Sequence, residues 1–76
     1  MALYRHDRWY DLLGAFVEVR LNDSIIRYGR VDDVMPDSSA AWIASDGCMT
    51  RVIVEAAEGH QLWVEPAELE ASRLFG

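Results

Sequence analysis

The residues able to bind a metal or act as nucleophiles are few in this chain and widely spaced. There are two histidines, His6 and His60, and one cysteine, Cys48. Their spacing matches none of the patterns that hold zinc. A cysteine without a Cys-x-x-Cys partner is more typical of a small buried hydrophobic residue than of a nucleophile. We therefore expect no metal and no cofactor.

Paired carboxylates are the remaining candidates for acid–base chemistry. Asp32 and Asp33 are adjacent, and Glu65, Glu68 and Glu70 gather near the C-terminus. Acidic pairs on a small surface are usually solvated and take no part in acid–base catalysis. The chain also has no lysine, which excludes a lysine nucleophile or a Schiff base. We therefore expect a non-enzymatic protein.

Aromatic and arginine side chains predict a binding surface instead. If the second half of the chain forms three successive strands, side-chain alternation places two tryptophans, a methionine and an arginine on one outer face. An exposed tryptophan beside an arginine contributes ~0.5 to 1 kcal/mol, and an apolar patch of this kind is typical of an interaction surface. Alternatively, the terminal helices cover this face and turn it into a second layer of core. The candidate partner-binding residues are Trp42, Met49, Arg51, Glu55 and Trp63.

A hairpin over residues 40 to 55 is expected to position most of these side chains. Asp46-Gly47 is typical of a two-residue type I′ turn, because both residues tolerate a positive φ, and β-branched residues follow it. With this turn, Trp42 lies opposite Arg51 across the ladder.

The N-terminal part predicts a short helix and a first strand. Residues 3 to 13 carry Trp9 and Leu12 at helical spacing, with Asp7 placed to cap the helix and Gly14 to end it. Residues 15 to 21 then alternate between apolar and polar side chains, as in a half-buried strand.

Asn22-Asp23-Ser24 is a turn cluster within a longer irregular loop that is expected over residues 22 to 27, and a second strand follows. This strand should start near Tyr28 and end before Pro36, which has no amide hydrogen for a ladder. Val31 and Val34 are three residues apart, so strict alternation fails and we expect a bulge.

The last strand and a closing helical turn follow the hairpin. We expect the fifth strand to pair with the fourth through an odd-numbered loop, because this register keeps Leu62 and Val64 on the inner side together with Val54. Pro66 suits the first position of a helical turn.

Together these elements predict an all-β fold: a five-stranded antiparallel barrel with a short N-terminal helix and a C-terminal helical turn. Residues 1–76 form one domain, divided into an N-terminal helical extension (1–14), the barrel (15–65) and a C-terminal turn and tail (66–76). With its Gly29-Arg30-Val31 second strand and Asp46-Gly47 hairpin, the layout resembles the SH3-like small-barrel superfamily. The resemblance is one of architecture and implies a fold without an activity.

A second resemblance concerns Gln61-Leu62-Trp63, followed by a segment that begins Pro66-Ala67. These residues are similar to the pore-lining run of the type II plasmid-borne dihydrofolate reductases, which are oligomeric enzymes with an SH3-like barrel. That family has tyrosine where this chain has Trp63, and a pore lysine that has no counterpart here. The resemblance implies an oligomeric pore enzyme as the alternative function.

Length and charge limit the class of partner. A chain of 76 residues buries only ~60% of its unfolded surface, so contacts with a second copy are a plausible source of stability. The formal net charge of −6 is the wrong sign for nucleic acid, and no apolar run is long enough to cross a membrane. A single cysteine suits a reducing compartment. We expect a cytoplasmic protein-interaction or assembly module that binds a protein partner or itself as a homo-oligomer.

Overall fold

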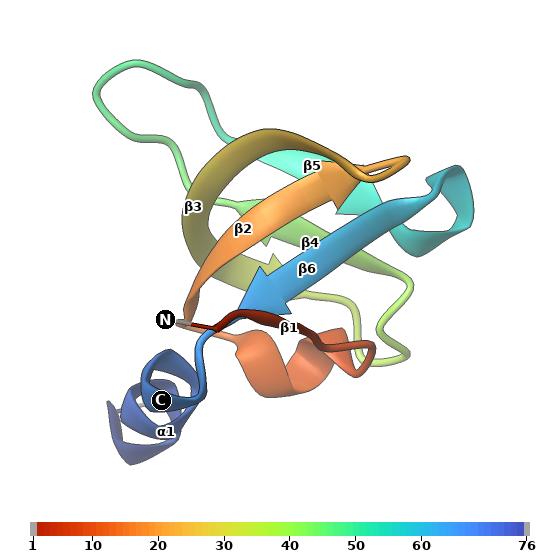
Figure 1. Cartoon of the computed structure of the whole chain (residues 1–76). Helices are drawn as coiled ribbons and strands as arrows, with labels where there is room; N and C mark the ends of the chain where they lie inside the picture. The colour runs from red at the N-terminus through yellow and green to blue at the C-terminus, as the bar shows by residue number, and fades with distance from the viewer. Residues whose placement is uncertain (1, 76) are drawn as a thin grey trace.

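Six antiparallel strands form one continuous bent sheet in the computed structural model, which describes residues 2–75 (Figure 1). The order across the sheet is β1-β6-β2-β3-β4-β5. The predominantly β fold is confirmed. The prediction of a closed five-stranded barrel is wrong in strand number and in closure, because a sixth strand is present and the end strands β1 and β5 do not pair. The strands are β1 (Tyr4–Arg5), β2 (Phe16–Leu21), β3 (Ser24–Val34), β4 (Ala40–Ile43), β5 (Val52–Glu55) and β6 (His60–Val64).

The N-terminal segment is not the predicted helix. It contains β1 and then a single 3-10 turn, η1 (Trp9–Leu12). The side chain of Asp7 accepts a hydrogen bond from Nε of Arg5 at 2.8 Å and caps no helix. Gly14 takes a positive φ of 84° after the turn, as its predicted role as a helix terminator requires.

The tight turn of the fold lies between β2 and β3. Asn22 and Asp23 have φ values of 51° and 67°, and Leu21 pairs with Ser24 across them. Positive φ at both central residues is the signature of a type I′ hairpin. The predicted irregular loop over residues 22 to 27 is therefore wrong, and β3 begins at Ser24.

Strand β3 curves so strongly that it belongs to both halves of the sheet (Figure 1). The predicted bulge is confirmed, because the register between β3 and β4 shifts between Val31 and Asp33. Gly29 makes the close packing of the two halves possible, since a Cβ atom there would overlap Cγ2 of Ile43.

The β4–β5 hairpin has a different turn from the one predicted. Gly47 does not take a positive φ, and Trp42 pairs with Ile53 instead of Arg51. Residues 44–51 form a loop that projects from the sheet (Figure 1). Because the register differs by two residues, Trp42 keeps its predicted side of the sheet.

The odd-loop prediction required β6 to pair with β5, and this prediction is wrong. Strand β6 lies between β1 and β2, and η2 (Ala56–Glu58) with Gly59 at φ 97° links it to β5. Leu62, Val64 and Val54 are nonetheless all buried, as predicted. The inward direction follows from alternation along each strand, whereas the neighbour of each strand does not.

The core fills the space between the two halves of the sheet and extends to the terminal elements. The C-terminal turn is confirmed as a helix, α1 (Pro66–Phe75), which contributes Leu69 to the core and packs against η1. The buried cluster consists of Trp9, Leu12, Ala15, Val17, Val19, Val31, Val34, Ala41, Ile43, Val54, Leu62, Val64 and Leu69.

Candidate protein-interaction surface

Four of the five predicted partner-binding residues lie on the β4–β5 hairpin. Trp42 is half-buried, whereas Met49, Arg51 and Glu55 are exposed. Trp63 lies on β6, and β2 and β3 separate that strand from β4. The structure therefore groups the first four side chains and places the second tryptophan on another part of the sheet. Their role in binding stays a prediction.

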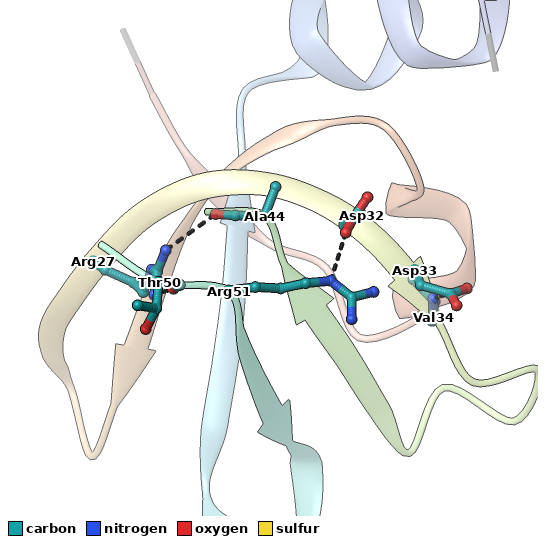
Figure 2. A network of polar contacts seen from close by, with 7 residues as sticks. All are labelled: Arg27, Asp32, Asp33, Val34, Ala44, Thr50 and Arg51. Carbon is teal, nitrogen blue, oxygen red and sulfur yellow. Dashed lines mark hydrogen bonds and ion pairs between the residues drawn. The ribbon is translucent and has the colours of Figure 1, made fainter. Parts of the chain in front are cut away.

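An arginine connects the hairpin to the bend in β3. Nε of Arg51 donates a hydrogen bond to Oδ2 of Asp32 at 2.6 Å (Figure 2). The guanidinium carbon of Arg51 lies 5.7 Å from the centre of the Trp42 ring. Both charged side chains are about half exposed, and ion pairs of this kind add little stability. Their effect is to fix the direction of the guanidinium over the exposed side of the hairpin.

A buried arginine, for which the sequence indicated no such role, binds both ends of the loop over residues 44–51. Arg27 is only 8% exposed, and it donates hydrogen bonds to the carbonyl oxygens of Thr50 (2.9 Å) and Ala44 (3.2 Å) (Figure 2). Its Nε has no hydrogen-bond partner among the described residues. Arg27 was assigned to a loop in the sequence, and no local pattern indicated that its side chain reaches the opposite hairpin.

The tip of the loop is closed by a side chain rather than by a type I′ turn. Oδ1 of Asp46 accepts hydrogen bonds from the backbone N–H groups of Cys48 and Met49, each at 2.9 Å. These bonds, with a smaller contribution from the charge of Arg27, lower the pKa of Asp46 below its ordinary value. Cys48 is exposed, so the prediction of a small buried residue is wrong, because the loop lifts it away from the core.

Strand β5 is an edge of the sheet and carries exposed apolar side chains. Among the described residues it pairs with β4 alone, and Val52 and Ile53 are 36% and 45% exposed. Ile53 has the same strand parity as Arg51 and Glu55. Side-chain alternation in the sequence was therefore enough to add Ile53 to the predicted partner-binding residues, which did not contain it. Val52 has the same parity as the buried Val54 and pairs with Ile43, but no further strand among the described residues covers it.

Trp63 is occupied by contacts within its own part of the sheet. The guanidinium carbon of Arg20 lies 3.9 Å from the ring centre, and Nε1 donates a hydrogen bond to Oε1 of Gln61 at 3.1 Å. On the other side of β6, Arg5 of β1 pairs with Trp63 in the ladder. These neighbours make Trp63 part of a surface distinct from the β4–β5 hairpin.

Comparison with protein-family models, with curated proteins and with solved structures finds no match to this chain. Within residues 2–75, no helix has the length and apolar character needed to cross a lipid bilayer. In the same part of the chain, no three His, Cys, Asp or Glu side chains come together as a group able to hold a metal ion.

Proposed function

We propose that this chain is a non-enzymatic protein-interaction module that assembles with a second copy of itself through strand β5. The observation that carries the proposal is that β5 is an edge strand on which Val52 and Ile53 remain exposed. A free edge presents backbone N–H and C=O groups to a further strand, and apolar side chains on it favour such pairing. At Glu55, Nδ1 of His60 lies 3.3 Å from the backbone N and 3.0 Å from the backbone O, so a second strand that pairs there replaces the His60 contact.

Two charged residues, Arg51 directly before β5 and Glu55 at its end, support one register for this pairing. In a two-fold antiparallel pair centred on Ile53, that residue lies opposite its own copy, and Arg51 of each chain lies opposite Glu55 of the other. Opposite charges in direct cross-strand positions contribute ~0.2 to 1 kcal/mol per pair, and the two-fold axis creates two such pairs. Ile53 pairs with Trp42, and Arg51 and Glu55 have the same parity as Ile53, so all three side chains are on the face that carries Trp42.

The size of the protein also supports assembly. A domain of 76 residues has a thin core, so burial of Val52 and Ile53 against a second copy adds apolar contacts that one chain alone lacks. We further infer that the architecture is an SH3-like barrel that stays open. The strongly bent β3, the 3-10 turn before β6 and the sequence order of β2 to β6 support this assignment, and β1 and β5 are its two edge strands.

A charge-exchange experiment tests the proposed register. Arg51→Glu places two acidic residues opposite each other in a homodimer, and Glu55→Arg places two arginines opposite each other. Each variant alone should sediment as a monomer at concentrations where the wild type is dimeric. An equimolar mixture of the two variants should recover the dimer, because the opposite charges are paired again.

Circular dichroism of each variant provides the control for folding, since Arg51 also contacts Asp32 within the chain. A wild type that sediments as a monomer at millimolar concentration would overturn assembly through β5. A dimer that persists in both separate variants would overturn the register centred on Ile53.

A further inference from the structure

A cavity of about 280 Å³ opens on the outer face of β2, β3 and β6, away from the β5 edge. Its walls include three aromatic rings, from Phe16, Tyr28 and Trp63, and two of these rings remain about half exposed: Phe16 at 47% and Tyr28 at 50%. Aromatic rings around a concave site that also holds a few polar groups are typical of a small-ligand pocket. The described lining consists of Leu3, Phe16, Val17, Glu18, Tyr28, Trp63, Glu65 and Glu68.

A buried carboxylate lies in the middle of this aromatic face. Glu18 is paired with Trp63 on one side and with Tyr28 on the other, so the three side chains form one row across β6, β2 and β3. Glu18 is only 5% exposed. A carboxylate is costly to bury unless a cation or hydrogen-bond donors compensate its charge. The row therefore needs a compensating positive charge, which the chain supplies at least in part.

Arg20 compensates the charge of Glu18 from one side of the row. Its Nε donates to Oε2 of Glu18, and its guanidinium stacks on Trp63. Along β2, Arg20 lies two residues after Glu18, whereas Phe16 lies two residues before it. Phe16 lines the cavity and Arg20 is not among the described lining residues, so the cavity opens on the side opposite Arg20.

The described lining of the cavity contains three glutamates and no basic side chain. Two of these glutamates are paired with arginines next to the cavity, Glu18 with Arg20 and Glu68 with Arg30, which leaves Glu65. Glu68 is held in place because its Oε1 accepts hydrogen bonds from the backbone N–H of Phe16 at 2.8 Å and from Arg30 at 3.4 Å. With a net charge of −6 for the chain, the site favours a cation over an anion or a neutral molecule.

From this geometry we infer that the cavity binds the head group of an alkylated ammonium ion. The guanidinium of Arg20 already lies over Trp63, and that of Arg30 lies 5.9 Å from the centre of the Phe16 ring. The negative faces of the rings that remain accessible, Tyr28 above all, attract such a cation, and its methyl groups suit apolar walls. A quaternary ammonium has no N–H donor, so it does not need the carboxylate oxygen that Arg20 uses. The site lies on other strands than the proposed β5 pairing and does not depend on it.

Titration with choline, followed by NMR through the indole N–H signal of Trp63, tests the inference. The signal is assigned from the spectrum of Trp63→Phe, and sodium chloride keeps the ionic strength constant. The matched neutral probe is 3,3-dimethylbutanol, in which carbon replaces the charged nitrogen. Choline should shift the signal to saturation, and the neutral alcohol should bind at least about tenfold more weakly.

Two tyrosine variants locate the site. Tyr28→Ala removes a ring from the cavity and should weaken choline binding about tenfold. Tyr10→Ala is the matched control, because Tyr10 is equally exposed at 52% and does not line the cavity. Equal affinities for choline and its neutral analogue, or equal weakening by the two variants, would overturn the inference.

A third probe distinguishes the source of the ammonium group. A short glycine-flanked peptide that contains trimethyllysine presents the same head group on a peptide chain. Tighter binding of the peptide than of choline assigns the site to a modified protein side chain, and tighter binding of choline assigns it to a free small molecule. Either result supports recognition of an alkylated ammonium, whereas failure of both probes to saturate contradicts it.

Discussion

Nη1 of Arg27 donates a hydrogen bond to the carbonyl oxygen of Thr50 at 2.9 Å, which ties the start of β3 to the far end of the 44–51 loop. A second bond, to the carbonyl of Ala44, fixes the near end of the same loop. One buried side chain thus holds both ends of a segment that otherwise projects from the sheet (Figure 2). The loop positions Arg51, and through it the exposed side of the hairpin.

Replacement of this arginine should loosen the loop and destabilise the fold. Arg27→Met keeps much of the buried aliphatic volume but removes both hydrogen bonds, so the free energy of unfolding in urea should fall by about 2 kcal/mol. Limited proteolysis should then cut first within residues 44–51. Arg8→Met is the control, because the Arg8 side chain is 81% exposed, and its effect should stay within about 0.5 kcal/mol. Equal stability of the two variants would contradict the role of Arg27.

Local patterns in the sequence were sufficient for the direction of most side chains. Alternation placed Val17 and Val19 on the buried face of the first strand. The failure of alternation between Val31 and Val34 correctly predicted the bulge. The same reasoning kept Trp42 on the correct side despite the wrong turn, because a shift of two residues preserves side-chain parity. Parity accounts for the side of the sheet on which Trp42 lies, whereas the role of the predicted site in binding stays a prediction.

Gly29 shows how closely the two halves of the sheet approach each other. It lies opposite Val17 in the β2–β3 ladder, and a Cβ atom added to it would overlap Cγ2 of the fully buried Ile43. Gly29→Ala should therefore lower the free energy of unfolding by about 1 to 3 kcal/mol, because overpacking forces the backbone or Ile43 to move. Chemical denaturation monitored by tryptophan fluorescence measures the change.

Gly47→Ala is the matched control for this substitution. Gly47 has no atom within 4 Å of an added Cβ, and its φ is not positive. Alanine at this position should be neutral or stabilise the protein by up to about 1 kcal/mol, because it restricts the unfolded chain. Similar losses of stability in both variants would show that the close approach at Gly29 is not the cause.

The errors in the sequence analysis have a common physical origin in contacts between distant residues. Asp46-Gly47 is able to form a tight turn, but Arg27 donates hydrogen bonds to carbonyl oxygens at both ends of the segment around it, and this segment forms a loop. Likewise, β6 pairs with β2 rather than β5, and alternation within a strand carries no information about its neighbour. The row of Trp63, Glu18 and Tyr28 became visible only once that strand order was known.

Acidification should weaken the tip of the 44–51 loop. The pKa of Asp46 is lowered from its ordinary value of 3.8, chiefly by the backbone N–H of Cys48 and then by that of Met49. A carboxyl whose folded pKa lies below its unfolded pKa stabilises the protein fully above the unfolded value, and this stabilisation is lost as the pH falls through the folded value. Urea denaturation of wild type and Asp46→Asn between pH 7 and pH 2 measures it, because the variant has no titrating carboxylate at this position. The wild type should be more stable than the variant at neutral pH, and the difference should shrink below about pH 4. A difference that stays constant across this range would show that the charged form of Asp46 is not what closes the loop.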